Sequence, residues 1–257
     1  MAMRSILSRL PEFAKAPLRR WIWRQMSLSA SLDSGLRVQI NCHADWTVYH
    51  EIFGCGQYDR AIEEALNQRP AGKMVVCDLG ANVGYFTLRL ADQFWKRRGS
   101  FDGLEVHLVE GAPLVVEELT RRLSAEHSLA GRITILPRLA GARSGKGRFQ
   151  TSPRHFGGHV GKSAQPGAIE VEYLDLINYF QNTDTIDLLK CDVEGSEIAL
   201  LREQAELFGK VARAVFEFHP PAEGWDECLR ILSRQGLSKK ELLRSWDGYS
   251  LWYFCRP

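Results

Sequence analysis

Residues 75–87 read Val-Val-Cys-Asp-Leu-Gly-Ala-Asn-Val-Gly-Tyr-Phe-Thr, and they constrain the fold more than any other part of the chain. An apolar run contains Asp78 near its end, small residues with two glycines follow, and a helix-like segment begins directly afterwards. A strand, a small-residue turn and a helix in this order form the ligand-binding corner of a Rossmann-like α/β sheet. The stretch therefore predicts such a sheet, with a binding site at the end of its first strand.

The spacing of the small residues in this turn indicates the kind of ligand. A dinucleotide-binding turn carries glycines at offsets 0, 2 and 5, whereas here Gly80, Asn82 and Gly84 alternate and Tyr85 takes the last offset. Asparagine tolerates a positive φ better than other non-glycine residues, so Asn82 suits the middle of the turn. The pattern acid-x-Gly-x-small-x-Gly resembles that of class I S-adenosylmethionine-dependent methyltransferases. The resemblance implies that these three small residues and Asp78 bind the cofactor.

A second acidic residue, Glu110, ends the next apolar run, Val-His-Leu-Val-Glu. A carboxylate at the end of a second strand can accept hydrogen bonds from two ribose hydroxyls, so Glu110 is the expected ribose partner. The sequence leaves open the alternative that Glu110 is only a solvated acid at the end of a strand. The adenine contact is the least defined, because the end of the third strand, residues 139–141, carries no acid.

Length, charge and cysteine usage limit the class of protein. A chain of 257 residues that is 45% hydrophobic fits one α/β domain with an extension. A net charge of +2 gives no global attraction to nucleic acid, and no apolar run approaches the length of about 18 residues that a transmembrane helix needs. The six cysteines form no Cys-x-x-Cys pair, which disfavours a zinc site or a disulfide framework and favours the cytoplasm.

The first thirty residues differ from the rest, because they carry six arginines and lysines against one acid, Glu12, with Trp21 and Trp23 interleaved. The favoured interpretation is a helix whose tryptophans pack on the domain. Contact with an anionic membrane surface and a transit-like sequence stay open as alternatives. Pro11 and Pro17 interrupt any long helix here. We expect residues 1–70 to form an extension or cap, with this basic segment at 1–30, and residues 71–257 to form the methyltransferase domain.

Hydrophobic patterns predict the order of the elements. Two strands are expected at 36–40 and 46–53, followed by a helix over 58–68. From residue 73 strands and helices alternate, which implies a parallel sheet covered on both faces. The expected fold is thus a Rossmann-like class I methyltransferase fold with a mostly parallel seven-stranded sheet and an antiparallel last strand. Its strands are predicted at 74–79, 105–110, 133–136, 186–191, 214–218 and 249–255.

A second motif, Leu188-Leu-Lys-Cys-Asp-Val-Glu-Gly-Ser-Glu197, spans the end of the predicted fourth strand. Ligands of open α/β sheets bind outside the carboxyl ends of the strands, which places Asp192 and Glu194 beside the acceptor. Carboxylates there can orient or deprotonate a hydroxyl, hold a divalent cation, or serve the next helix N-terminus. The first role is favoured, and no metal site is expected, although a divalent cation stays open.

Histidines supply further candidates. His219 follows the predicted fifth strand and is a candidate base, ligand or rim residue. His155 and His159 lie in the glycine-rich, basic segment 141–167, and they are candidate substrate contacts. Loops of this length in compact domains are usually functional.

With both motifs in place, the chain resembles the FkbM-type methyltransferases over residues 45–257. Members use S-adenosyl-L-methionine and typically methylate hydroxyl oxygens of sugars, glycolipids or polyketide-like metabolites. The resemblance implies an O-methyltransferase with a small-molecule or saccharide acceptor, and it does not settle which residue is the base. It rests on Asp78-Leu-Gly-Ala-Asn-Val-Gly84 with Phe86-Thr87, on Glu110 with Pro113, and on Ile186-Asp-Leu-Leu-Lys-Cys-Asp-Val-Glu-Gly-Ser-Glu197.

Two other functions stay open at this point. A nucleic-acid methyltransferase is disfavoured by the near-neutral charge and by the absence of an Asn/Asp-Pro-Pro-Tyr motif, so no nucleic-acid partner is expected. A methyltransferase-like binding or scaffold protein without activity is the second alternative. The sequence makes no prediction of the oligomeric state.

Overall fold

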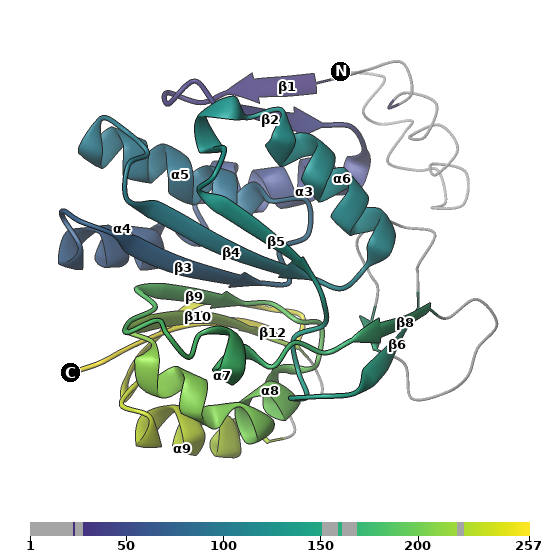
Figure 1. The fold of residues 1–257 in the computed structure, drawn as a ribbon, viewed down its shortest axis with the longest axis vertical. Helices are drawn as coiled ribbons and strands as arrows, with labels where there is room; N and C mark the ends of the chain where they lie inside the picture. Colours follow the sequence, from purple (N-terminus) through teal and green to yellow (C-terminus); the bar gives the residue numbers. More distant parts are fainter. Residues whose placement is uncertain (1–22, 24–27, 151–158, 161–168, 220–223) are drawn as a thin grey trace.

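The computed structural model describes residue 23 and residues 28–150, 159–160, 169–219 and 224–257, and it is built around a seven-stranded sheet (Figure 1). The strands lie in the order β11-β12-β10-β9-β3-β4-β5. β12 is antiparallel to both of its neighbours, and every other pair in this sheet is parallel. The predicted sheet and its antiparallel last strand are therefore confirmed. The strands are β3 (Met74–Leu79), β4 (Leu104–Glu110), β5 (Ile133–Pro137), β9 (Leu188–Cys191), β10 (Arg213–Phe218), β11 (Lys239–Trp246) and β12 (Tyr249–Cys255).

The strand order reverses direction at β3, which is the middle one of the five parallel strands. β4 and β5 lie on one side of it and β9 and β10 on the other. In an open α/β sheet such a reversal leaves a crevice at the carboxyl ends of the two diverging strands. This topology places the end of β3 beside the ends of β4 and β9, where the two sequence motifs lie.

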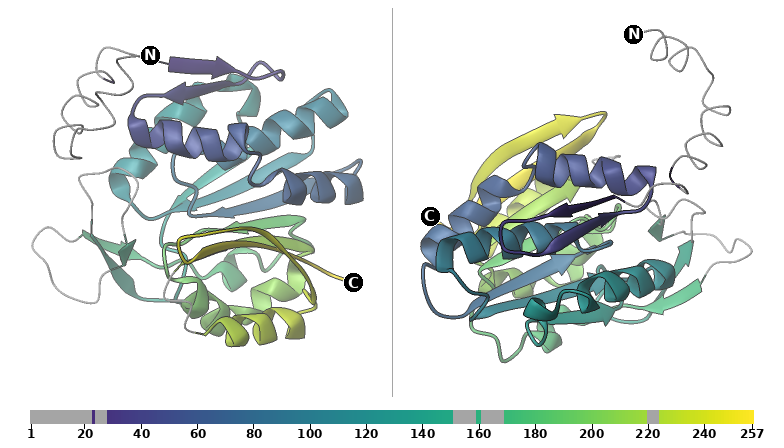
Figure 2. Two further views of the ribbon diagram at one scale, coloured as in Figure 1. Left: turned by 180° about the vertical axis from the view of Figure 1, so that it is seen from behind. Right: turned by 90° about the horizontal axis from the view of Figure 1, so that it is seen from above.

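Helices cover both faces of the sheet (Figures 1 and 2). All six residues of β3 are buried, as expected for a central parallel strand. Met74 and Val76 belong to one apolar core, whereas Val75 and Cys77 belong to the other, because successive side chains point to opposite faces. The first face carries α4 (Asp59–Gln68), α5 (Tyr85–Arg98) and α6 (Pro113–Ser124), and the second carries α7 (Leu176–Tyr179), α8 (Glu197–Glu203) and α9 (Trp225–Arg234).

The sequence determines where α5 and α6 begin and end. α5 starts after Gly84 and ends at Gly99, both of which have left-handed backbones. Three basic residues, 96–98, occupy its last turn, where positive charge is favoured by the helix dipole. α6 begins with Pro113, which has no N–H to leave unpaired in the first turn. Both helices agree with the periodicity of the sequence.

The segment before the sheet differs from the prediction. β1 (Leu28–Ser31) and β2 (Arg37–Ile40) form an antiparallel pair, so the strand expected at 36–40 is present. The strand expected at 46–53 is wrong, because this stretch forms α3 (His43–Tyr49) and a π-helical turn, η1 (His50–Gly54). Its aromatic residues at 46, 49 and 53 are spaced by three and four and stack on one another with ring centroids 5.9 and 5.1 Å apart. That spacing is helical, although the run also looks like an alternating strand.

Two further elements lie outside the predicted set. β11 was not predicted, because it is an edge strand with mostly exposed side chains and little apolar alternation. The segment between β5 and α7 contributes a small antiparallel sheet. That sheet has the order β7-β6-β8 and consists of β6 (Lys146–Gln150), β7 (His159–Val160) and β8 (Ile169–Glu172). Within the described ranges, no helix has both the length and the apolar character needed to cross a membrane.

Candidate active site

The turn after β3 has the backbone geometry that its small residues predict. Gly80 and Gly84 adopt φ values of 74° and 88°, and Asn82 adopts 50°. A Cβ on Gly80 would lie 1.8 Å from the backbone oxygen of Asp192, so no side chain fits there. A Cβ on Gly84 would lie 2.9 Å from Leu119 on α6. The first glycine therefore permits contact between the two sequence motifs, and the second permits close packing of α5 on α6.

A buried charge pair supports this turn from behind. Asp78 is fully buried, accepts a hydrogen bond from Thr87 Oγ1 at 3.1 Å, and lies 3.4 Å from Lys190 Nζ. Lys190 donates to the Gly80 carbonyl at 2.6 Å and lies 3.3 Å from Asp192 Oδ2. Burial raises the pKa of Asp78, and Lys190 opposes that rise. Asp78 thus contacts the turn through Lys190, while Asp192 presents its carboxylate to the cavity described below.

Glu110 joins β4 to the same turn. Its Oε2 accepts the Asn82 backbone N–H at 2.9 Å, and its Oε1 accepts the Ala112 N–H at 2.8 Å. Burial raises the pKa of Glu110, and the two backbone donors oppose that rise. A carboxylate has about four acceptor positions, so each oxygen retains one for a ligand hydroxyl.

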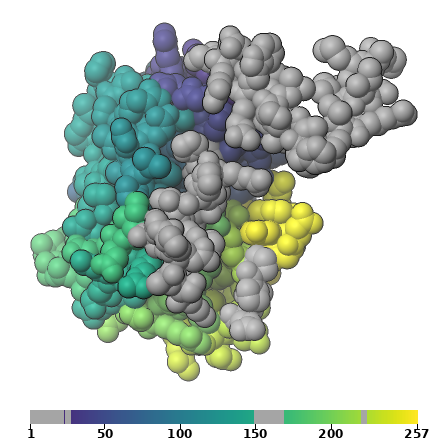
Figure 3. Space-filling model, turned by 90° about the vertical axis from the view of Figure 1, so that its right-hand side faces the viewer, coloured from purple at the N-terminus to yellow at the C-terminus, as the bar shows by residue number. Residues whose placement is uncertain are grey.

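A cavity of about 150 Å³ lies between the turn, η1 and the carboxyl ends of β9 and β10. The parallel strands, whose arrows are drawn in Figure 1, point toward the side of the molecule that faces the viewer in Figure 3. One part of the cavity wall is apolar, with Val48 and Ile52 from the segment before the sheet and Phe86 from α5. The other part is acidic, so the cavity combines an apolar surface with groups that bind hydroxyls or cations. The acidic lining residues are Glu51, Asp192, Glu194 and Glu217.

His219 lies at the centre of these acids. Its Nδ1 is 2.8 Å from Glu197 Oε1, and its Nε2 is 3.3 Å from Glu194 Oε2 and 3.7 Å from Asp192 Oδ1. Glu217 Oε1 is 3.9 Å from Nε2. Burial disfavours the imidazolium, but Glu197 and the other carboxylates outweigh burial and raise the pKa of His219 to about 9. Burial and Asp192 raise the pKa of Glu217 to about 8.

The structure brings together most of the residues that the sequence singled out. The cofactor candidates meet at the ends of β3 and β4, and Asp192, Glu194 and His219 meet beside them at the ends of β9 and β10. His155 lies outside the described residues, and only the backbone of His159 is described, in β7. Their predicted substrate contacts stay predictions, as does the membrane contact of residues 1–30.

Sequence reasoning allowed a pair of Lys190 with an acid of the second motif, which its contact with Asp192 confirms, but it missed the contacts of Lys190 with Asp78 and Gly80 and the role of Glu197. Lys190 and Glu197 both lie inside the second motif, where Lys190 reads as an interior strand residue and Glu197 as the first acid of α8. The detectable signal was a lysine within an apolar strand that faces the acid of a neighbouring strand. Glu197 had no such signal, because its partner His219 is brought near only by the pairing of β9 with β10.

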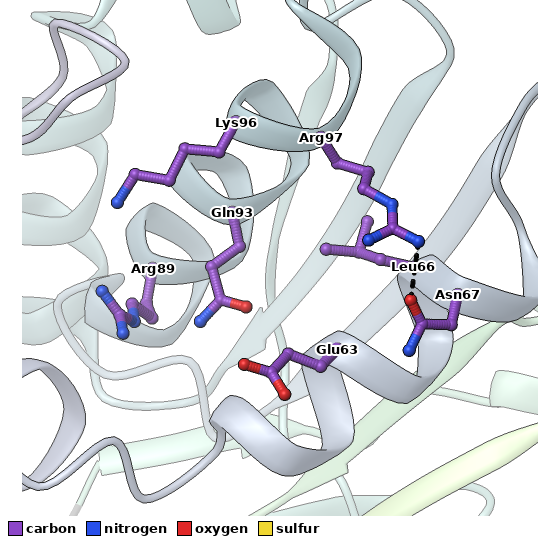
Figure 4. Close-up of a pocket in the computed structure, with 7 residues that line it drawn as sticks. All are labelled: Glu63, Leu66, Asn67, Arg89, Gln93, Lys96 and Arg97. Atoms are coloured by element: carbon purple, nitrogen blue, oxygen red, sulfur yellow. Dashed lines mark hydrogen bonds between the residues drawn. The ribbon is translucent and has the colours of Figure 1, made fainter.

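A second hollow, of about 490 Å³, lies between α4 and α5 (Figure 4). Its three basic side chains already have partners: Arg89 donates to Asp59 at 2.8 Å, Arg97 donates to Asn67 at 2.7 Å, and Lys96 lies 2.8 Å from Asp92. None of its lining residues lines the cavity at Asp192. We therefore place the active site at the strand ends and not in this hollow.

The strand order and the position of the turn at the point of reversal are those of a class I methyltransferase fold. Residues 78–238 match the family model of the methyltransferase FkbM domain, and the chain belongs to this family. No curated protein sequence matches the chain significantly.

Solved methyltransferases share the fold at low sequence identity. The methyltransferase FkbM from Methylobacillus flagellatus is 19% identical, with a TM-score of 0.50 over 71% of this chain and 43% of its own length. A SAM-dependent methyltransferase from Agrobacterium tumefaciens is 11% identical, with a TM-score of 0.51 over 90% of this chain and 70% of its own. Magnesium protoporphyrin IX methyltransferase from Synechocystis, solved with bound SAM, is 15% identical, with a TM-score of 0.45 over 83% and 96%. The chain spans less than half the length of the first of these proteins, and at such identities the similarity shows the fold alone.

Proposed function

We propose that this protein transfers a methyl group from S-adenosylmethionine to a hydroxyl oxygen of a sugar, glycolipid or other small metabolite. The observation that carries the proposal is the meeting of two sites at one edge of the sheet. The glycine turn after β3 contacts the backbone of Asp192, which begins the acidic cluster after β9. A methyl donor held by the turn would therefore lie next to groups that bind and deprotonate a hydroxyl.

The cofactor corner suits the donor-rich tail and ribose of adenosylmethionine. Asn82 Oδ1 is buried and accepts no hydrogen bond from the described residues, and Asp78 Oδ1 faces Lys190 Nζ at 3.4 Å. Glu110 retains acceptor positions beside them, and the absence of a Cβ at Gly80 keeps the backbone of the turn open to close approach. A ligand with an ammonium group and hydroxyls would supply the missing donors.

When bound, adenosylmethionine supplies its sulfonium methyl group: a C–O bond forms to the acceptor, the C–S bond breaks with its electron pair left on sulfur, and the hydroxyl proton must leave. The chain's own residues position the acceptor and take that proton. Asp192 and Glu217 both line the cavity and are carboxylates, which are suited to both tasks. The apolar wall of Val48, Ile52 and Phe86 excludes water from the reacting hydroxyl.

Isotope transfer tests the reaction class. The purified chain would be incubated with methyl-labelled adenosylmethionine and separated fractions of a cell extract, and the labelled product would be identified by mass spectrometry. We expect an O-methyl group on a hydroxylated small molecule. Label in RNA or in protein, or no transfer by a chain that binds adenosylmethionine in calorimetry, would contradict the proposal.

Replacing Asp192 by Asn should separate chemistry from cofactor binding. The side chain keeps its size but loses the charge, so turnover is expected to fall by on the order of 10²-fold. The affinity for adenosylmethionine should change by less than about threefold, because the Asp192 contact at Gly80 is made by its backbone. Rapid-quench kinetics measure the turnover number, and calorimetry measures the affinity for adenosylmethionine. An unchanged turnover number would show that Asp192 takes no part in the methyl transfer.

A further inference from the structure

Three side chains of the acidic cluster converge like the ligands of a metal ion. One carboxylate oxygen each from Asp192 and Glu194 and one ring nitrogen of His219 lie within 4.8 Å of one another. Measured from His219 Nε2, the carboxylate oxygens are at 3.3 and 3.7 Å. Two ligands on an ion with bonds of about 2.1 Å lie about 3 Å apart at right angles and about 4 Å apart across the ion. The two distances from Nε2 therefore fall within the range of one coordination shell.

The orientation of His219 is a separate observation that points to a cation. The side chain is only 8% exposed, and Nδ1 faces Glu197, a buried carboxylate that also accepts the Gly195 N–H at 3.0 Å. Because a carboxylate only accepts, Nδ1 carries the proton and donates. Nε2 faces Asp192 and Glu194 and makes no hydrogen bond to the described residues, so a cation that displaces the Nε2 proton would bind its lone pair. Metal-binding histidines are typically held in this way by a carboxylate on the other ring nitrogen.

The charges around the site also favour the binding of a cation. Four carboxylates surround one imidazole: Asp192, Glu194, Glu197 and Glu217. Lys190 is the nearest fixed cation, and it is shared with Asp78 and the Gly80 carbonyl. A partly buried excess of negative charge is costly unless it is paired or coordinates a metal.

We propose that Asp192, Glu194 and His219 bind one divalent metal ion, with Glu197 as a positioning residue. Two carboxylates and one imidazole suit Mn²⁺, with Mg²⁺ as the competing ion. The role of the ion rests on the proposed function. Asp192 and Glu194 line the cavity, so the remaining coordination positions of the ion would hold two adjacent oxygens of the acceptor. Coordination would lower the pKa of the acceptor hydroxyl. The hydroxyl proton would then pass to the carboxylate of Glu217, which lines the cavity and is not one of the three ligands.

Manganese binding tests the site without any methyl donor or acceptor. The chelator-treated full chain would be titrated with Mn²⁺, with free Mn²⁺ followed by electron paramagnetic resonance. We expect saturation at one ion per chain and displacement by excess Mg²⁺. Asp192→Asn and His219→Gln should each weaken binding at least tenfold, and Glu197→Gln should weaken it about threefold or more. Glu241→Gln is the matched control, because this exposed acid on β11 lies outside the cluster.

Circular dichroism would verify that each variant is folded. No saturable binding by the folded wild-type chain, or equal affinity in the control and cluster variants, overturns the metal site and leaves an imidazolium held by four carboxylates. The role of the ion can be tested separately from the methyl-transfer reaction. Methyl transfer at an undiminished rate in excess chelator would overturn the role and leave the proposed function intact. Bound Mn²⁺ without methylation of any small molecule would overturn the proposed function and leave the metal site intact.

Discussion

At the scale of single residues, Gly80 carries the contact between the two sequence motifs. Replacement by Ala should cost about 1–3 kcal/mol for the left-handed backbone alone, and more because its Cβ would lie 1.8 Å from the Asp192 oxygen. Gly72→Ala is the matched control, since Gly72 has a φ of 77° but no atom near its Cβ position. Urea denaturation measures both variants. Equal losses in the free energy of unfolding would show that the close approach to Asp192 is not rigid.

Lys190 is the residue whose charge the turn and the acidic cluster share. Its removal in Lys190→Met would leave the fully buried Asp78 without its counter-charge, and breaking such a pair costs about 3–5 kcal/mol. The double variant Lys190→Met with Asp78→Asn should recover part of that loss, because no buried charge is then left alone. Denaturation of the single and double variants gives the coupling free energy. A double variant no more stable than Lys190→Met would contradict the pairing.

Residue patterns in the sequence predicted the cofactor corner better than the acceptor side. The turn needs residues that adopt a positive φ, and glycine and asparagine are the residue types that do so most readily. Gly80, Asn82 and Gly84 could therefore be recognised from one short stretch of sequence. The cluster around His219 depends on the register of β9 against β10, which brings Glu197 within 2.8 Å of a residue 22 positions away. No local pattern records such a contact. For this reason Asp192, Glu194 and His219 were found from the sequence, and Glu197, the partner of His219, was not.

At the scale of elements, Arg122 on α6 connects the segment before the sheet to the domain. It is nearly buried, lies 2.7 Å from Asp45 at the start of α3, and donates to the Gln39 carbonyl of β2 at 3.0 Å. This long-range pair also explains why the stretch after Asp45 is helical when its alternation predicted a strand. Asp45 accepts the Asn41 N–H at 2.7 Å and is fixed at the first turn of α3. Tertiary contacts of this kind override local preference.

Arg122→Met should therefore loosen α3 and η1. It would leave the buried carboxylate of Asp45 unpaired, at a cost of about 3–5 kcal/mol. Arg121→Met is the control, because Arg121 is 51% exposed and its ion pair with Glu118 is worth about 0–1 kcal/mol. Hydrogen exchange should accelerate across residues 28–54 in the first variant alone. Equal exchange in both would mean that other contacts hold this segment.

At the scale of the whole molecule, the positions of the parallel strands along the chain were predictable because each is a short and mostly apolar run. The five predicted parallel strands lie within two residues of those observed, since burial on both faces determines their composition. The edge strand β11 was missed because its exposed side chains carry no such constraint. The cavity could not be predicted at all. It requires η1 and α5 to meet the ends of β9 and β10, and β9 begins only at residue 188, whereas η1 ends at residue 54 and α5 at residue 98.

The assembled fold makes one prediction that depends on all of these elements, namely that adenosylmethionine stabilises the chain through Glu110. A ligand present at about a hundred times its dissociation constant stabilises the native state by about 2.7 kcal/mol, which corresponds to a rise in melting temperature of about 5–10 °C for a chain of this size. NAD should give no rise, since the turn lacks the dinucleotide spacing. Glu110→Ala should abolish the rise with adenosylmethionine, because it removes both the support of the Asn82 N–H and the expected ribose acceptor. Glu105→Ala is the matched control: Glu105 stands at the other end of β4, where it pairs with Lys73 at 2.7 Å, so its loss should lower the melting temperature of the free chain slightly and keep the ligand-induced rise. A full rise in Glu110→Ala would place the ribose elsewhere and leave Glu110 as a support of the turn alone.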